Sequence, residues 1–229
     1  MGELTEKEIY QIAIDGPAVS GKGTVARMLG QRLGYVCLDT GALYRAFTIH
    51  CLNKGARPVD NDDLERALES IDINVECRDG ATHVSLDGED VTSKLHDHEV
   101  CEEVFKYAQI KKVREKVRGI QRAMGAKQTL ICEGRDITSV IFPKAKYKFY
   151  LTASLDARAQ RRYAMEVAKG SIVTYEEVKE TIRQRDYADA TREESPLVLV
   201  KDATVVDASE ISAAEAVDII QAIIQGEKK

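Results

Sequence analysis

The sequence of 229 residues contains no apolar run long enough to cross a membrane and no apolar signal region at its N-terminus. A membrane-spanning helix needs roughly 18 apolar residues, so these absences disfavour a transmembrane protein and a secreted one. The net charge of −5 argues against a general nucleic-acid binder. We therefore expect a cytoplasmic monomer, with neither a membrane nor a nucleic acid as its partner.

The sequence also lacks a Cys-x-x-Cys pair, although cysteines occur at positions 37, 51, 77, 101 and 132. This absence argues against the common zinc-binding and redox motifs. Most of the cysteines lie in apolar strand or helix patterns, so we expect reduced thiols in the protein interior. His96 and His98 lie close together, but no further histidine or cysteine accompanies them, and we expect no metal site there.

What the sequence does contain is a glycine-rich segment after the apolar residues 9–14. A helical apolar pattern follows Lys22, which completes the strand, loop and helix start that phosphate binding requires. Backbone N–H groups of such a loop bind phosphate oxygens, and the positive end of the helix assists them. We predict that Lys22 contacts the outer phosphates of a nucleoside triphosphate. The predicted loop residues are Gly16, Pro17, Ala18, Val19, Ser20, Gly21, Lys22, Gly23 and Thr24.

Two other interpretations of this segment stay open. Residues 21–26 also fit the Gly-x-Gly-x-x-Ala fingerprint of dinucleotide-binding proteins, with Asp39 further along. That fingerprint normally follows the strand end directly, whereas several residues separate Asp15 from the first of these glycines. A glycine-rich turn without a ligand is the other interpretation, and it would leave Lys22 without a partner.

The residue after the lysine is Gly23, where many phosphate-binding loops carry the serine or threonine that binds magnesium. Gly-Lys-Gly-Thr is the variant found in nucleoside monophosphate kinases, in which magnesium is held mostly through phosphate and water. We therefore expect Mg²⁺ to arrive with the nucleotide, and we expect no metal site made of protein ligands alone.

Apolar strand patterns alternate with helical patterns along most of the chain. Besides the strand before the loop, strands are expected near residues 35–38, 129–132, 147–151 and 203–207. Five strands interleaved with helices predict an α/β fold of the phosphate-binding-loop NTPase type, a parallel sheet with helices on both faces. A long helix is expected over residues 98–125, with a break near Gln109.

Residues 58–97 have a different pattern. Apolar and polar residues alternate here, and the turn signals Asp79-Gly80 and Asp87-Gly88 separate the alternating runs. This pattern is typical of a small antiparallel sheet. We interpret the segment as a substrate-binding subdomain inserted into a core domain of residues 1–57 and 98–229.

Charged residues follow several of the predicted strands. Asp39-Thr40-Gly41 follows one strand, and Glu133-Gly134-Arg135-Asp136 follows another. Ligands of parallel sheets bind at the carboxyl ends of the strands, so these residues are expected to converge on a charged ligand. Arginine pairs with phosphate through two parallel hydrogen bonds. The candidate arginines are Arg45, Arg135, Arg158, Arg161, Arg162, Arg183, Arg185 and Arg192.

Most of these arginines lie on two predicted helices that flank a loop around Gly170. Thr174 and Glu177 have the spacing of a capping box at the start of the second helix. We predict that residues 155–192 form a helical lid that closes over the triphosphate, with Arg162 and Arg185 as its functional arginines. A solvated helix face with ion pairs is the alternative for Arg158 and Arg183.

Together these motifs resemble the bacterial cytidylate kinase family. The resemblance rests on the loop, on Asp-Thr-Gly-Ala-Leu-Tyr-Arg at 39–45, on Gly-Arg-Asp at 134–136 and on the Arg-Asp, Asp and Arg of 185–192. It extends from residue 12 to about residue 207. It implies phosphorylation of CMP and dCMP with ATP as the phosphoryl donor and Mg²⁺ as its companion.

Other functions would leave other marks. Another kinase, of the UMP, adenylate or shikimate type, shares the loop but does not require the insertion or Asp136. A nucleotide-gated switch of the GTPase kind carries an Asn-Lys-x-Asp motif, whereas Asn53-Lys54 is followed here by Gly55-Ala56.

The resemblance also implies roles for single residues. Lys22, Arg162 and Arg185 would act on the transferring phosphoryl group, and Asp136 would accept a hydrogen bond from the 4-amino group of cytosine. Arg45 and Arg135 would bind the phosphate of CMP. The full set of implied CMP contacts is Thr40, Tyr44, Arg45, Arg114, Gly134, Arg135, Asp136, Asp189 and Arg192.

The sequence departs from the family pattern in two places. Gly-Arg-Asp-Ile is followed by Thr138-Ser139, where the family usually has Gly-Thr. Counting back from Arg114 without gaps, a position near the base that is commonly serine is Phe105. We therefore expect a shifted loop after Asp136 and one cytosine hydrogen bond fewer.

Overall fold

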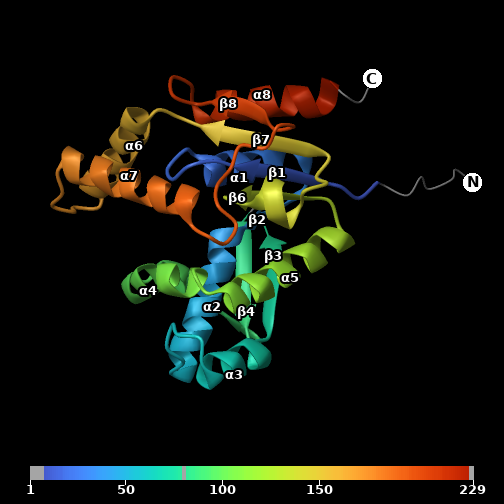
Figure 1. The fold of residues 1–229 in the computed structure, drawn as a ribbon. Helices are drawn as coiled ribbons and strands as arrows, with labels where there is room; N and C mark the ends of the chain where they lie inside the picture. Colours follow the sequence, from blue (N-terminus) through green and yellow to red (C-terminus); the bar gives the residue numbers. More distant parts are fainter. Residues whose placement is uncertain (1–7, 79–80, 227–229) are drawn as a thin grey trace, which may run out of the picture.

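The structure is a computed structural model that describes residues 8–78 and 81–226, and it contains a parallel sheet and a smaller antiparallel sheet (Figure 1). The parallel sheet has five strands in the order β2-β6-β1-β7-β8, and every neighbouring pair is parallel. This confirms the predicted fold class. Its strands are β1 (Gln11–Asp15), β2 (Val36–Asp39), β6 (Leu130–Gly134), β7 (Tyr147–Thr152) and β8 (Thr204–Asp207).

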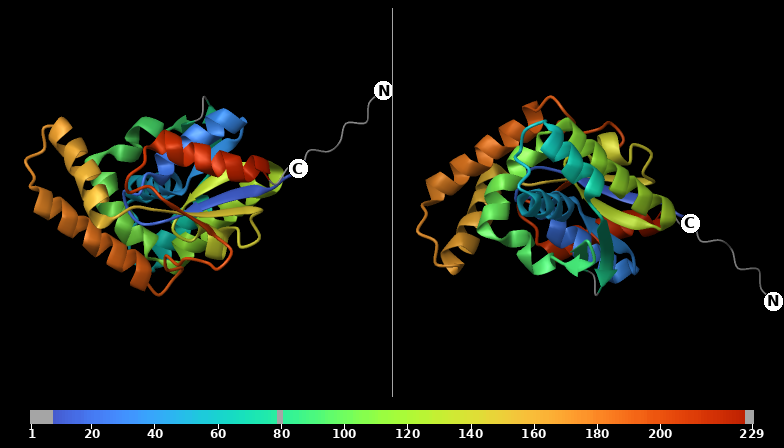
Figure 2. Two further views of the ribbon diagram at one scale, coloured as in Figure 1. Left: turned by 90° about the horizontal axis from the view of Figure 1, so that it is seen from above. Right: turned by 90° about the horizontal axis from the view of Figure 1, so that it is seen from below.

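Helices cover both faces of the parallel sheet (Figure 2). Side chains of α1 and α8 pack on one face, and those of α2, α5 and η2 on the other. The helices are α1 (Lys22–Leu33), α2 (Thr40–Lys54), α3 (Asp62–Ser70), α4 (His98–Ala108), α5 (Lys111–Lys127), α6 (Leu155–Ala168), α7 (Tyr175–Thr191) and α8 (Ala213–Gly226), with the 3₁₀ turn η1 (Thr92–His96) and the short π-helix η2 (Ile137–Ile141). Within these described ranges, no helix combines the length and the apolar character of a membrane span.

The central strand β1 shows why the strands read as continuous apolar runs. Ile12 and Ile14 pack toward α1 and α8, whereas Ala13 packs toward the opposite helices, and all three are fully buried. Successive side chains of a strand point to opposite faces, so a strand covered on both sides must be apolar throughout.

Local signals set several helix boundaries. Helix α1 ends at Gly34, which adopts a left-handed conformation with φ of 67°. Thr174 and Glu177 form the predicted capping box of α7, and the predicted break separates α4 from α5 at Gln109. Helix α2 begins at Thr40, because the Asp39 side chain accepts a hydrogen bond from the Ala42 N–H and caps the helix there.

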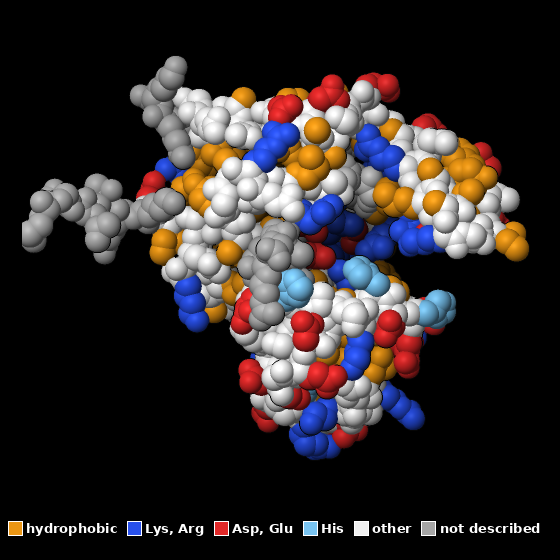
Figure 3. All heavy atoms as spheres, turned by 180° about the vertical axis from the view of Figure 1, so that it is seen from behind, with side chains coloured by type: hydrophobic (Ala, Val, Ile, Leu, Met, Phe, Trp, Pro, Cys, Tyr) orange, Lys and Arg blue, Asp and Glu red, His pale blue; other side chains and the backbone are white. Residues whose placement is uncertain are grey.

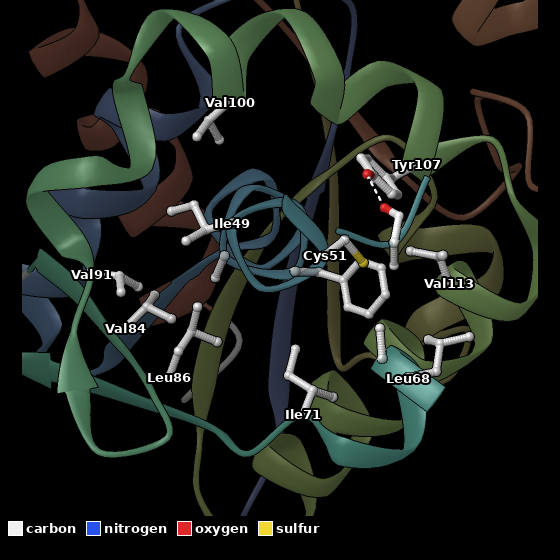
Figure 4. Packing of buried hydrophobic residues seen from close by; sticks show 14 of the residues in the cluster. Ile49, Cys51, Leu68, Ile71, Val84, Leu86, Val91, Val100, Tyr107 and Val113 are labelled. Atoms are coloured by element: carbon white, nitrogen blue, oxygen red, sulfur yellow. Dashed lines mark hydrogen bonds between the residues drawn. The ribbon is translucent and has the colours of Figure 1, made fainter. Parts of the chain in front are cut away.

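The antiparallel sheet consists of β3 (Ile73–Arg78), β4 (Ala81–Leu86) and β5 (Glu89–Asp90). The turn at Asp87-Gly88 leads into β5 as predicted, whereas the predicted turn at Asp79-Gly80 lies outside the described residues. This sheet has an apolar core shared with α2, α3, α4 and the start of α5 (Figure 4). The Tyr107 hydroxyl donates a hydrogen bond to the Ala56 carbonyl inside that core.

Three cysteines lie where the apolar patterns predict them. Cys37, Cys51 and Cys132 are buried in the sheet and in α2. Cys101 is exposed on α4, so the expectation of an interior thiol is wrong at that position. The helix presents this side chain away from the apolar face that carries Val100.

Candidate active site

A cleft of about 610 Å³ opens at the carboxyl ends of the parallel strands. Seen from behind, the hollow between the upper and lower parts of the molecule is lined with lysine and arginine side chains (Figure 3). Strand pairing explains why the charged segments meet here, because Asp39 lies opposite Glu133 and Asp15 lies opposite Gly134 in the sheet register.

Nearly all of the residues singled out in the sequence line this cleft, and their individual roles stay predictions. Gly16 and Pro17 are buried beneath the wall and do not line it. The lining members are Ala18, Val19, Ser20, Gly21, Lys22, Gly23, Thr24, Thr40, Tyr44, Arg45, Arg114, Gly134, Arg135, Asp136, Arg162, Arg185, Asp189 and Arg192.

Glycine is required at the root of the phosphate-binding loop. A Cβ atom on Gly16 would lie 2.0 Å from the carbonyl oxygen of Leu151, which no side chain tolerates. At the other end of the loop, Gly21 has φ of 93° and directs the chain into α1. The loop therefore packs against β7 while its second half faces the cleft.

The Lys22 side chain folds back over the loop. Its ammonium donates hydrogen bonds to the Pro17 carbonyl at 2.7 Å and to the Ser20 hydroxyl at 3.3 Å. Burial, followed by the charge of Arg135, lowers the pKa of Lys22 to about 7. An anionic phosphate beside the ammonium would favour its charged form and raise this pKa again.

Several buried arginine nitrogens have no hydrogen-bond partner in the described part of the chain. They include Nε of Arg45, Nε of Arg114 and Nη2 of Arg192, all on side chains that line the cleft. Burial, followed by Arg135, also lowers the pKa of Arg185. Unpaired buried donors among like charges fit an anionic ligand, because phosphate oxygens would accept these hydrogen bonds.

The cleft lining also contains a buried ion pair. Arg114 Nη2 donates to Asp136 Oδ2 at 2.7 Å, and both side chains are at most 10% exposed. The Arg114 guanidinium also lies over the Tyr44 ring, 5.6 Å from its centroid. Asp136 therefore pairs with Arg114, and Arg135 has a different partner.

That partner is Asp189. Arg135 Nε donates to Asp189 Oδ2 at 2.7 Å, and Arg192 lies 3.6 Å from the other carboxylate oxygen. Arg192 Nε donates to the Ser195 carbonyl, and Arg118 donates to the Ser195 hydroxyl. Asp189 thus holds in place two of the arginines that are predicted to contact CMP.

Sequence reasoning missed a buried carboxylate under the loop. Asp15 is fully buried and accepts hydrogen bonds from the N–H groups of Ile137 and Thr138 and from the Thr138 hydroxyl, the last at 2.6 Å. Thr138, which differs from the usual family residue, therefore joins β1 to the segment that carries Arg135. No local pattern indicates it, because these residues lie 123 positions apart.

The arginines of α6 and α7 have three different environments. Arg162 and Arg185 line the cleft, as does Arg161, which donates to the Ala208 carbonyl. Arg183 is an exposed partner of Glu180, which is the solvated alternative. Arg158 fits neither interpretation, because it is buried away from the cleft wall.

The position counted as Phe105 does not lie at the cleft. Its side chain is 52% exposed, and its neighbour Val104 lines the cleft instead. Val104 has no side-chain polar atom, so no hydroxyl reaches the predicted base site from this position.

The carboxylates of Asp39 and Glu133 are neighbours at the ends of adjacent strands. Burial, followed by the charge of Asp39, raises the pKa of Glu133 to about 7, and both residues line the cleft. Within residues 8–78 and 81–226, no cluster of three or more His, Cys, Asp or Glu side chains has a geometry suited to a metal ion. A hydrated cation held jointly by these two carboxylates and a nucleotide still fits this charge arrangement.

Comparison with known proteins agrees with this geometry. The family model described as "Cytidylate kinase" matches residues 12–226. The chain belongs to the cytidylate kinase family. This confirms the resemblance inferred from the sequence motifs.

Individual members of the cytidylate kinase family are similar over nearly their whole length. The cytidylate kinase of Caldicellulosiruptor bescii is 38% identical over 214 residues, which cover 93% of each chain. That of Carboxydothermus hydrogenoformans is 41% identical and covers 93% of this chain and 96% of its own. A solved structure, TT1252 of Thermus thermophilus, shares the fold with a TM-score of 0.54 at 18% identity, covering 97% of this chain and 100% of its own.

Proposed function

We propose that this protein transfers the γ-phosphoryl group of ATP to CMP and dCMP, giving the nucleoside diphosphates and ADP. The observation that carries the proposal is the meeting, in one cleft, of a phosphate-binding loop, unpaired arginine donors and the Arg114–Asp136 pair. Family membership over residues 12–226 supports it independently.

Phosphoryl transfer needs two phosphate-bearing substrates held in line and positive charge around the phosphoryl group that is transferred. Lys22 and the loop N–H groups bind the outer phosphates of ATP, and Arg45 and Arg135 bind the phosphate of CMP. Arg162 and Arg185 reach the transferring group from the opposite wall of the cleft. The positive charges of Arg135, Arg162 and Arg45 near the buried Arg185 support this assignment, because a strongly anionic ligand would compensate them.

Arg114 and Asp136 read the base. The Asp136 carboxylate accepts a hydrogen bond from the 4-amino group of cytosine, whereas the 4-oxo group of uracil would be repelled by it. The ion pair with Arg114 supports this role, because it holds the carboxylate in one orientation inside the cleft. Val104 supplies an apolar part of the cleft lining, so discrimination rests on the ion pair.

Mg²⁺ is held mainly by the phosphates and by water. Asp39 and Glu133 would contact its water ligands, and their mutual repulsion supports a cation between them and the nucleotide. When bound, the ion neutralises phosphate charge and orients the β- and γ-phosphates.

We also propose that different segments of the chain bind the acceptor, form the core and cover the site. Residues 58–97 form the substrate-binding subdomain of a core made of 1–57 and 98–229, and residues 155–192 form the lid. The separate apolar cluster of α6 and α7 supports a lid with its own packing. We also infer a cytoplasmic monomer whose partners are ATP, CMP and dCMP.

The test mixes the purified protein with ATP, CMP and Mg²⁺ and quantifies products by ion-exchange chromatography. CDP and ADP should appear in equal amounts, and omission of Mg²⁺ should abolish both. ADP without CDP, or no turnover of either nucleotide, would refute the proposal.

A further inference from the structure

The loop residue Ala18 is held on both sides by the lid helices. Its N–H donates a hydrogen bond to Asp186 Oδ1 of α7 at 2.9 Å. Its carbonyl accepts one from Arg158 Nη1 of α6 at 3.0 Å. Arg158 and Asp186 are also paired directly, and Arg158 donates to the Ala153 carbonyl at the end of β7. We call Ala18, Arg158 and Asp186 the loop–lid latch.

An apolar contact adjoins the loop–lid latch. Val19 packs against the small cluster formed by Ala159, Val178 and Ile182 inside the α6–α7 hairpin. Its φ of 59° is in the left-handed region, which a β-branched side chain rarely adopts. Such a conformation is strained, so the surrounding contacts must hold it in place.

The α6–α7 hairpin projects from the molecule (Figure 2). Arg158 lies in the first turn of α6 and Asp186 within the last two turns of α7, so the loop–lid latch lies at the base of this hairpin. Arg162 is one helical turn beyond Arg158, and Arg185 directly precedes Asp186. Both arginines line the cleft, so small rotations at the latch displace the guanidinium groups that face the phosphates.

We propose that Asp186 is a positioning residue that transmits occupancy of the phosphate-binding loop to the lid, aligning Arg162 and Arg185 when ATP binds. Bound phosphates fix the peptide groups of the loop, including the two that flank Ala18. Asp186 and Arg158 bind one atom of each of these peptides, and α6 and α7 therefore follow the loop. The inference rests on the proposed function only in the roles of the two arginines.

Asp186→Ala removes the acceptor of the Ala18 N–H and the counter-ion of Arg158, whereas Asp186→Asn keeps an oxygen acceptor without the charge. Val19→Gly relieves backbone strain and removes the apolar contact, so it should fold even where Asp186→Ala does not. Asp156→Ala is the matched control, because Asp156 also joins α6 to α7, through Lys179 and Tyr175, but makes no contact with the loop.

The first measurement is hydrogen exchange of residues 155–192 with a non-hydrolysable ATP analogue and no CMP. The analogue should protect the lid in the wild type and in Asp156→Ala, and this protection should be lost in Asp186→Ala and Val19→Gly and reduced in Asp186→Asn. Equal protection in all variants, no protection in the wild type, or equal loss in Asp156→Ala would overturn the proposal.

The second measurement separates kcat from KM. Misplacement of reacting groups by about 1 Å can cost 10²-fold, so kcat of Asp186→Ala should fall by about ten- to a hundredfold. The KM for CMP should change by less than about threefold, because the acceptor contacts remain. An unchanged kcat would overturn the proposal. The exchange experiment needs no acceptor, so its result stands even if the wild type fails to phosphorylate CMP.

Discussion

Replacement of Asp136 by asparagine tests how the cleft distinguishes cytosine from uracil. The Arg114 and Asp136 side chains are 4% and 10% exposed. Asp136→Ala would leave a buried guanidinium unpaired, which commonly costs about 3–5 kcal/mol and would obscure the effect on the substrate. Asp136→Asn keeps the shape and one oxygen acceptor for Arg114, while it removes the charge and replaces the other oxygen with an NH2 donor.

The expected loss of kcat/KM for CMP follows from the loss of charge in one hydrogen bond. Bonds to charged groups contribute about 1.5–3 kcal/mol and neutral ones about 0.5–1.5 kcal/mol, so CMP should lose about 1.4 kcal/mol, or tenfold in kcat/KM. The asparagine amide can also rotate and donate to the 4-oxo group of uracil, which should improve UMP by a similar factor. The CMP/UMP ratio of kcat/KM should therefore fall by about 10²-fold.

The assay measures kcat/KM for both nucleotides on the wild type, on Asp136→Asn and on a control. Asp202→Asn is the control. Asp202 lies in the loop before β8, pairs with Lys148 of β7 and does not line the cleft. Its ratio should equal that of the wild type. If Asp136→Asn lowers kcat/KM by the same factor for CMP and for UMP, Asp136 only orients Arg114 and does not distinguish the bases.

Three further predictions concern the loop, the carboxylates beside it and the buried threonine. Lys22→Ala should lower kcat by about 10²–10³-fold with an unchanged Tm, because Lys22 compensates phosphate charge; near-normal turnover would contradict this role. Glu133 binds a proton more tightly in the folded state, with its pKa raised from 4.5 to about 7, so stability should fall as pH rises through this window. Urea titrations should show the wild type losing stability relative to Glu133→Gln between pH 4.5 and 7, and a constant difference would refute the shift. Thr138→Val should cost about 1–2 kcal/mol of unfolding free energy and raise the KM for CMP, since Asp15 loses a buried donor. Thr48→Val is the control, because the Thr48 hydroxyl donates to the Tyr44 carbonyl of its own helix. This variant should leave the KM for CMP unchanged, and an equal rise of KM in both variants would contradict the role of Thr138.

Local patterns were sufficient for most of the fold. The parallel strands are apolar on both faces, as Ile12, Ala13 and Ile14 illustrate, and this reads directly from the sequence. The capping box at Thr174 depends on neighbouring residues alone, so its position was predicted correctly. Convergence of the charged segments followed from parallel strand ends meeting at one edge.

Contacts between distant segments were not predictable in this way. The Asp186 carboxylate bonds to Ala18 across 168 positions, and no spacing rule connects these residues. The ungapped count along the sequence placed Phe105 near the base, whereas Val104 is the residue that lines the cleft. The backbone breaks between α4 and α5, so a position counted back from Arg114 does not keep its place on the helix face.

The most direct test of the proposed function is competition among acceptors in one vessel. ATP labelled at its γ-phosphate is mixed in limiting amount with equal concentrations of CMP, dCMP, UMP, AMP and shikimate, and the labelled products are separated. Label should enter CDP and dCDP first and UDP only slowly. Label that enters ADP, UDP or shikimate phosphate ahead of the cytidine products would contradict the assignment of this cleft to CMP.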